Sequence, residues 1–376
     1  MQKRLFTTLG LHVIELGVLV FITAALWETP VALAFAGQTT VSSPPAEAAG
    51  SRAALALNNR GVALAQAKKY QEAIRLYKQA ITLDPNAPDF YTNLGLAYFK
   101  MGAYQKSILW FRRAVALQTS GAKAQTLLGM ALYGAQDYRE AAAQLEKVSR
   151  MTAPSAELLF VIAQCDLQSK QYQKVIDTFR RIETVEPHSA AAHMLLGQAF
   201  DGLGQYDDAI QEFQKAAAIA PGQPDVHFLI GYLYWKQREL QKASGEFETE
   251  LKNDPQNAKA KAYLGDVDYH EGDLRTARRL LQEALALDGS LRIACLDLGI
   301  IDTEQKQYAS AIVELKRAVR LDPTKTDAHV RLALTYQAMG LKDAAAAERQ
   351  KTIRLLRAAA TRLQQRVLQP DRGSSH

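Results

Sequence analysis

A period of 34 residues constrains the fold of this chain more than any other feature. Counting from Ala54 in steps of 34 gives nine consecutive units that end at Ala359, and no unit contains an insertion. Two positions of the unit are small almost throughout. The eighth position holds Gly61, Gly95, Gly129, Ala163, Gly197, Gly231, Gly265, Gly299 and Ala333. The twentieth holds Ala73, Ser107, Ala141, Val175, Ala209, Ala243, Ala277, Ala311 and Ala345. This period is typical of stacked supersecondary units that share a continuous core.

Large apolar residues and prolines recur in the same frame. The twenty-fourth position holds Tyr77, Phe111, Leu145, Phe179, Phe213, Phe247, Leu281 and Leu315. Five prolines occupy the thirty-second position, at Pro85, Pro187, Pro221, Pro255 and Pro323. We expect the large side chains to fill the space beside the small residues, and each proline to mark a helix boundary. Each unit is therefore predicted to be helix, tight turn, helix, with second helices that begin at residues such as Tyr70, Tyr206 and Tyr308.

With the Leu-Gly, Tyr, Ala, Phe and Pro signals at these spacings, the sequence resembles the tetratricopeptide-repeat (TPR) family over about four fifths of its length. The resemblance implies an all-α, right-handed superhelical solenoid of about nine 34-residue repeats with a C-terminal capping helix. We expect the solenoid to occupy residues 54–341. Residues 342–368 are predicted to form the last repeat helix and a basic amphipathic capping helix, before a disordered tail, 369–376. Contact of this basic helix with an anionic membrane or an acidic partner is the alternative to capping.

The N-terminal segment is predicted to direct export. Two basic residues precede an apolar run, 16–27, which is too short to span a bilayer. Ala34 and Ala36 follow with the small-residue spacing that a signal peptidase recognises. This pattern favours a cleaved signal peptide over residues 1–36; a retained N-terminal anchor is the alternative.

Residues 37–53 are poor in large apolar side chains and rich in Ser, Pro and Ala, and we expect a flexible linker there. The protein is accordingly predicted to be a bacterial protein that is periplasmic or secreted, or else anchored by an uncleaved N-terminal segment.

The net charge of +6 does not indicate nucleic-acid binding. From Lys342 to the end there are eight basic and three acidic residues, a balance of +5, so the rest of the chain is nearly neutral. Nucleic-acid-binding proteins usually concentrate Lys and Arg along one surface. We therefore expect protein partners and no nucleic acid, with membrane contact possible through either end of the chain.

In the TPR family the first helices of successive hairpins line a concave groove. Positions 2, 5, 9 and 12 of the unit share one face by the 100° rotation per residue, and we expect that face to point into the groove. The partner-binding residues predicted there are Phe99, Tyr133, Phe160, Met194, Phe228, Tyr232, Trp235, Asp266 and Tyr269. The richest aromatic patch lies in the sixth unit, and such side chains are common binding hot spots. The alternative is that some of them fill space between adjacent first helices.

One family subset grips a C-terminal carboxylate with Lys, Asn and Arg at fixed groove positions. Asn93 and Lys123 match two of its five positions, but Asn58, Val62 and Leu127 occupy the others. This carboxylate clamp is therefore predicted to be broken.

No motif for catalysis or for metal binding is present in the sequence. His193, His227 and His329 all occupy the fourth position of their units, so we expect them one or more layers apart, too far to share a metal. They are predicted to be partly buried histidines with satisfied hydrogen bonds. Cys165 and Cys295 lie four units apart and are predicted to be two buried, free thiols.

These features predict an exported scaffold or adaptor that holds a segment of a partner polypeptide in its groove, without enzymatic activity, cofactor or metal. The alternative is an accessory subunit of a bacterial envelope machine for polysaccharide export, pilus biogenesis or outer-membrane assembly. An enzyme with an unfamiliar site is disfavoured, because the repeats leave no separate catalytic domain.

Overall fold

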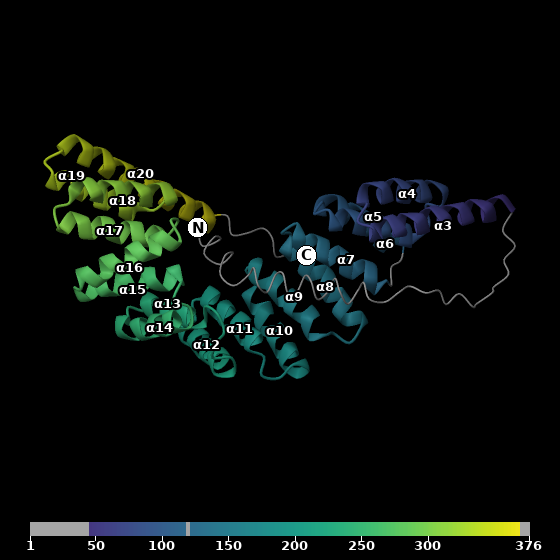
Figure 1. Ribbon diagram of the computed structural model, residues 1–376, viewed down its shortest axis with the longest axis horizontal. Coiled ribbons are helices and arrows are strands. Elements are labelled where there is room, and N and C mark those ends of the chain that lie inside the picture. Colours follow the sequence, from purple (N-terminus) through teal and green to yellow (C-terminus); the bar gives the residue numbers. More distant parts are fainter. Residues whose placement is uncertain (1–44, 118–120, 369–376) are drawn as a thin grey trace. The chain divides into compact units, whose positions relative to one another are not determined.

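The computed structural model describes residues 45–117 and 121–368 (Figure 1). The predicted signal segment 1–36, with Ala34 and Ala36, and the predicted tail 369–376 lie outside the described residues. Within the described ranges the chain forms eighteen helices, α3 to α20, and no strand. The all-α prediction and the helical-hairpin prediction are confirmed.

The described residues divide into two compact units at residues 219 and 220. The N-terminal unit, 45–219, contains five hairpins. Their helices are α3 (Pro45–Gln66) with α4 (Tyr70–Leu83), α5 (Pro88–Lys100) with α6 (Tyr104–Leu117), α7 (Ala122–Gly134) with α8 (Tyr138–Met151), α9 (Ala156–Gln168) with α10 (Tyr172–Val185), and α11 (Ala190–Leu203) with α12 (Tyr206–Ile219).

The C-terminal unit, 220–368, contains four hairpins. Their helices are α13 (Val226–Lys236) with α14 (Leu240–Asn253), α15 (Ala258–Glu271) with α16 (Leu274–Leu287), α17 (Arg292–Glu304) with α18 (Tyr308–Leu321), and α19 (Thr326–Ala338) with α20 (Lys342–Leu368). In each unit every hairpin packs against the next (Figure 1).

The predicted linker is wrong over its last nine residues. Helix α3 begins at Pro45, so residues 45–53 are helical and extend the first hairpin backwards. Five alanines lie between positions 46 and 54, and alanine has the highest helix propensity of all residues. The end of this segment is also held by packing, because Ala54 is fully buried beside Ala80 and Phe90.

Close contact between the eighth and twenty-fourth positions holds each hairpin together. A Cβ atom added to Gly197 would lie 2.6 Å from the Phe213 ring, and one added to Gly231 would lie 2.8 Å from the Phe247 ring. The same approach joins Gly61 to Tyr77, Gly95 to Phe111, Gly129 to Leu145, Gly265 to Leu281, and Gly299 to Leu315. The prediction that large side chains fill the space beside small residues is confirmed.

A second pair of positions, the fourth and the twenty-third, faces across the hairpin 19 residues apart. His193 Nδ1 lies 2.6 Å from Glu212 Oε2, and His329 Nδ1 lies 2.6 Å from Glu348 Oε2. His227 makes the equivalent contact with a glutamate of α14 at 2.7 Å. The three histidines therefore have hydrogen-bond partners, as predicted, and each one links the two helices of its own hairpin.

The last helix only partly caps its hairpin. In α20 the side chains of Ala345 and Glu348 are buried, but every described side chain from Leu356 to Gln365 is exposed. The capping prediction thus holds for the first half of α20 and is wrong for the second half, which runs beyond the short α19. Among the described residues, no helix combines the length and the apolar character needed to cross a bilayer.

We predict that Gly231→Val lowers the free energy of unfolding by about 1–3 kcal/mol, because overpacking forces the Phe247 ring and the nearby α14 backbone to move. Gly245→Val is the matched control, since a Cβ at Gly245 in α14 meets nothing within 4 Å. That control should be neutral or slightly stabilising. Thermal unfolding followed by circular dichroism compares the two variants, and equal shifts in both would contradict the packing argument.

Candidate interaction surface

An aromatic cluster lies on the first helices of the C-terminal unit, where α13, α15, α17 and α19 contact one another in succession. The aromatic cluster consists of Phe228, Tyr232 and Trp235 from α13, Phe247 from α14 and Tyr263 from α15. Tyr263 is central: its ring centroid lies 5.0 Å from that of Trp235, 5.3 Å from that of Tyr232 and 5.7 Å from that of Phe228. The cluster thus joins two successive hairpins.

The members of the aromatic cluster differ in exposure. Phe228, Phe247 and Tyr263 are buried, with Phe228 only 2% exposed. The prediction that Phe228 lines a groove is therefore wrong, because neighbouring helices enclose its ring and it fills the space between them. Tyr232 and Trp235 remain partly exposed and are stacked, with ring centroids 5.9 Å apart and planes 16° apart. These two rings are the part of the cluster that a partner could reach.

Asp266 fixes the orientation of the Trp235 ring. The indole Nε1–H of Trp235 donates a hydrogen bond to Asp266 Oδ2. Asp266 is buried, so the prediction that it lines a groove is wrong: it supports Trp235 from beneath. His270, one turn further along α15, places Nε2 3.7 Å from the other oxygen of Asp266. A buried acceptor of this kind restricts the rotamers of the indole.

A second carboxyl group, from Asp297 on α17, is buried against Asp266. Burial raises the pKa of Asp297 well above its usual range, and the Asp266 carboxylate raises it further, while Arg292 and Arg331 act in the opposite direction. Its Oδ2 atom has no hydrogen-bond partner among the described residues. We infer that Asp297 is neutral and shares its proton with Asp266 in a hydrogen bond, since two adjacent buried carboxyl groups cannot both ionise cheaply.

Tyr269 lies near the end of the same face of α15 and is partly exposed. Its hydroxyl donates a hydrogen bond of 2.7 Å to Glu304 Oε1 on α17. Burial, together with this bond, raises the pKa of Tyr269 to about 12. Thr303 and Thr335 make the corresponding link between α17 and α19 at 2.8 Å. Hydrogen bonds to the next first helix therefore hold the rings of Trp235 and Tyr269 in place.

The four remaining predicted residues belong to the N-terminal unit. Phe99 and Met194 are both buried, which makes the predicted groove contact wrong for both. Tyr133 and Phe160 are partly exposed. The Phe99 ring packs edge-on against Tyr104, the first residue of the second helix in its own hairpin. A side chain at the twelfth position can therefore pack inside its own hairpin and need not line a groove.

Two smaller predictions also have structural outcomes. The Asn93 side chain donates to Asn58 Oδ1 at 2.9 Å, so this amide, one of the two matches to the carboxylate clamp, is already engaged. Cys165 and Cys295 are both free and buried, as predicted. Burial raises the pKa of the Cys295 thiol to about 12 and that of Cys165 above its usual range, so both thiols stay protonated.

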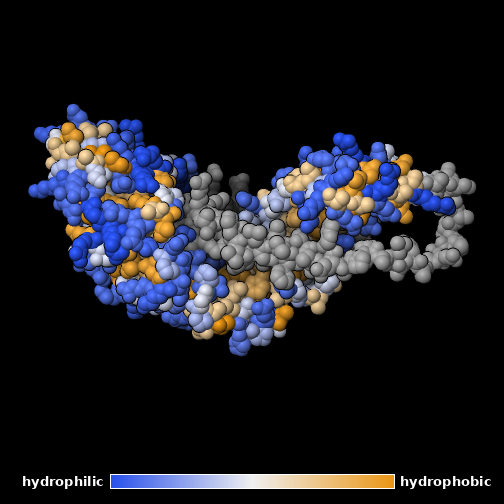
Figure 2. Space-filling model, in the orientation of Figure 1, coloured by the Kyte–Doolittle hydropathy of each residue, from blue (hydrophilic) through white to orange (hydrophobic). Residues whose placement is uncertain are grey.

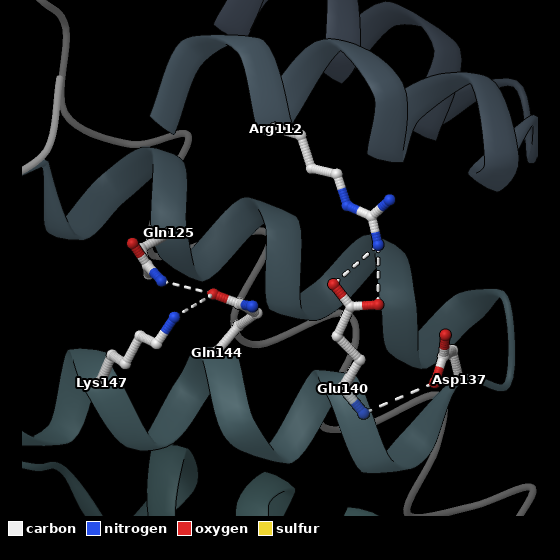
Figure 3. A network of polar contacts seen from close by, with 6 residues as sticks. All are labelled: Arg112, Gln125, Asp137, Glu140, Gln144 and Lys147. Carbon is white, nitrogen blue, oxygen red and sulfur yellow. Dashed lines mark hydrogen bonds and ion pairs between the residues drawn. The ribbon is translucent and has the colours of Figure 1, made fainter. Parts of the chain in front are cut away.

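The second helices carry a different polar surface. A shallow pocket of about 460 Å³ is lined by Arg112, Gln125, Glu140, Gln144 and Lys147, among others. Figure 3 shows the polar contacts that these five side chains make. These groups satisfy one another: Arg112 donates to both oxygens of Glu140 at 2.7 Å, and Gln125 donates to Gln144 at 2.6 Å. A pocket of about 270 Å³ at equivalent repeat positions lies between α16 and α18. The two pockets arise from the regular spacing between neighbouring second helices, and neither indicates a ligand.

Comparison with known families agrees with this architecture. The TPR repeat model matches residues 61–102, 197–237 and 299–340, and a second tetratricopeptide-repeat model matches residues 228–291. The chain is a tetratricopeptide-repeat protein. A model described as anaphase-promoting complex, cyclosome, subunit 3 matches residues 100–182 and 146–216 of this TPR protein. A search of curated protein sequences gives no significant match.

Solved structures similar to this TPR protein are distant in sequence. The APC/C hetero-tetramer Cut9–Hcn1 is 16% identical with a TM-score of 0.52, over 80% of this chain and 73% of that one. YrrB, titled a TPR protein with an unusual peptide-binding site, is 18% identical with a TM-score of 0.42, over 53% of this chain and 98% of its own. Yeast Tom70 is 15% identical with a TM-score of 0.41, over 86% and 97%. At these identities only the likeness to Cut9–Hcn1 carries an argument, and it concerns the fold alone.

The sequence analysis missed two residues that organise this surface in the TPR protein. Tyr263 and Asp297 both occupy the sixth position of their units, outside the face that was expected to point into the groove. Rotation about one helix does not show which side chains of the neighbouring helix fill the space between them. One sequence signal could have identified Asp297: it is an aspartate within the apolar stretch 293–301. An acid in such a stretch is expected to be buried and to need a polar partner nearby.

We predict that Asp297→Asn removes a pH-dependent loss of stability. Because the pKa of Asp297 is raised on folding, its protonated form favours the folded state below the ordinary Asp pKa of about 3.9. That contribution is lost as pH rises through the raised pKa. The asparagine amide can still donate to Asp266 without ionising. The midpoint of thermal unfolding, measured from pH 4 to about pH 9, should therefore fall less steeply in the variant than in the parent.

Asp343→Asn serves as the control for this experiment, since it removes an exposed carboxylate from the same unit. Its pH profile should match that of the parent. If Asp297→Asn also follows the parent profile, the two carboxyl groups do not share a proton.

Proposed function

We propose that this TPR protein is a non-catalytic scaffold that binds a segment of another polypeptide through the first-helix face of its C-terminal unit. The observation that carries the proposal is the stacked pair Tyr232 and Trp235, partly exposed above buried aromatic rings. Tyr269 extends the same face along α15. Tyr and Trp are enriched among residues that dominate binding free energy.

The fixed orientation of these rings supports a binding role. Binding costs less free energy when the anchoring side chains are already ordered in the free protein. Trp235 is ordered by its hydrogen bond to Asp266 and by stacking on Tyr232, and Tyr269 is ordered by its bond to Glu304. A partner segment with apolar side chains, extended or helical, fits such a surface.

The proposed location of this activity is outside the bacterial cytoplasm, in the periplasm or the secreted fraction. This part of the proposal rests on the sequence of residues 1–36, with its apolar run and the small residues Ala34 and Ala36. The partner would then be another envelope or secreted protein.

The experiment is affinity capture from the envelope fraction of the native host, with mass spectrometry of the bound proteins. The bait is the parent protein or a triple variant, Tyr232→Ala, Trp235→Ala and Tyr269→Ala. We expect at least one protein that is enriched by the parent and reduced about tenfold or more by the variant, since a hot-spot truncation typically costs about 2 kcal/mol or more.

A double variant, Leu109→Ala and Val313→Ala, is the matched control. Both side chains are large, apolar and exposed, and both lie on second helices. The control should retain the partner. Equal recovery by the parent, the control and an equally folded triple variant would exclude the first-helix face as the binding surface, and recovery of no partner by the parent would contradict the scaffold proposal itself.

A further inference from the structure

The second half of α20 has no counterpart among the other second helices, each of which has 14 residues. Helix α20 is 27 residues long, whereas its partner α19 has 13 residues. Thr352 and Leu355 are the last side chains that are even partly buried, and all described side chains from Leu356 onward are exposed. We call residues 353–368 the α20 extension. At 1.5 Å per residue this segment is about 24 Å long.

One side of the α20 extension carries an apolar stripe. Ile353, Leu356 and Leu363 are 47%, 55% and 64% exposed, and Ala360 lies between them on the same side. At 100° per residue these four positions fall within roughly 80° of the helix circumference. On the described face shown in Figure 2, apolar residues are mostly interspersed with polar ones. A continuous stripe on a projecting helix therefore requires an explanation that the packing of the hairpin does not supply.

The charged residues of the α20 extension are all basic. Between positions 353 and 368 the sequence contains four basic residues and no acidic residue: Arg354, Arg357, Arg362 and Arg366. Within the described residues, no salt bridge joins Arg354, Arg357 or Arg362 to a carboxylate. The positive charges of Arg354, Arg357 and Arg362 are thus not neutralised by the hairpin from which the extension continues.

We propose that the α20 extension docks on an anionic phospholipid surface, with its apolar stripe at the level of the acyl boundary and its arginines against the phosphates. A helix with an apolar stripe and a basic remainder lies in the plane of such an interface. Basic residues near an anionic leaflet each add to the affinity, which falls as salt screens the attraction.

The distribution of charge favours lipid over the other possible occupants. Two copies of the extension paired along their stripes would bring eight positive charges together without one carboxylate, which disfavours a homodimer through this helix. An acidic groove supplies charge for the arginines but no apolar surface for the stripe, whereas an anionic bilayer supplies both. At 100° per residue Arg357 lies about 40° from the Ile353 edge of the stripe, where phosphates flank an apolar face, and Arg354 and Arg362 lie further round the helix.

This surface is separate from the aromatic face, because it lies on the last second helix and contains none of the residues proposed to hold a polypeptide. A lipid-bound α20 extension would leave Tyr232, Trp235 and Tyr269 available. The protein would then hold its partner beside a membrane surface, and the failure of either proposal would leave the other unaffected.

A local probe tests the lipid proposal in the full chain. An environment-sensitive fluorophore is attached to Ala360→Cys, on the stripe, or to the neighbouring Thr361→Cys, which points away from it. The two native thiols are buried, so labelling is directed to the new cysteine. Because the readout is local, membrane binding by the N-terminal segment does not mimic it.

Vesicles of phosphatidylcholine containing phosphatidylglycerol should shift the emission of the probe at position 360 to the blue, with little change at position 361. Pure phosphatidylcholine, or high salt, should abolish the shift. The double variant Arg357→Gln, Arg362→Gln should require about thirtyfold more anionic lipid for half the shift, roughly fivefold per arginine, whereas Arg357→Lys, Arg362→Lys should stay near the parent.

Three results would overturn the proposal. The first is no shift with anionic vesicles while poly-glutamate produces one, which indicates an acidic polypeptide as the occupant. The second is a shift that grows with protein concentration in the absence of vesicles, which indicates a second copy. The third is an equal shift at positions 360 and 361, or with neutral vesicles, which shows that the stripe and the charge do not determine the contact.

Discussion

The close approach of two helices within each hairpin is the constraint on which the rest of this structure depends. Glycine at the eighth position removes the Cβ that would otherwise collide with the side chain at the twenty-fourth position. The large side chain then occupies the hairpin interior, as Phe213 and Phe247 do at 1% and 0% exposure. Since each hairpin presents a similar outer surface, the next one packs on it in a similar way, and one contact repeated along the sequence gives a stack.

This dependence explains why so much of the fold could be predicted from the sequence. Contacts inside a hairpin join positions at a fixed separation, so the period exposes them directly. The linker was predicted less well because small residues such as those at 46–53 suit both a flexible segment and a helix. Helix α3 forms there because the end of the segment, at Ala54, is packed against the first hairpin.

The interaction surface could be predicted only in part, for a physical reason. The exposure of a first-helix residue depends on the side chain of the neighbouring helix that lies beside it, and this neighbour is not fixed by the repeat. Phe228 was expected to be accessible, but Tyr263 from the next hairpin covers it. The same neighbour leaves Tyr232 and Trp235 at the surface and supports them from beneath. The position of Tyr263 therefore explains both why Phe228 is buried and why Tyr232 and Trp235 remain accessible.

The two buried carboxyl groups next to Trp235, from Asp266 and Asp297, are unfavourable for folding stability but favourable for an ordered binding surface. An apolar residue at Asp297 would avoid the cost of a buried acid, yet it would leave Asp266 without a proton donor on that side. With both aspartates present, Asp266 accepts the hydrogen bond that orients the indole. A fixed indole at a partly exposed position loses little conformational entropy when a partner covers it. Burying the two aspartates therefore costs folding free energy, but it fixes the orientation of the exposed Trp235 ring.

The α20 extension stays helical although it lacks packing, and local propensity accounts for this. Short isolated helices are marginal because nucleation is costly, but the packed first half of α20 supplies a formed nucleus. Three consecutive alanines follow at 358–360, and neither glycine nor proline interrupts the segment before Pro370. Binding of the α20 extension to a surface therefore does not require the segment to fold on contact. Most amphipathic segments that bind lipid must be ordered on contact, whereas here the apolar stripe and the arginines are already arranged by the hairpin that precedes them.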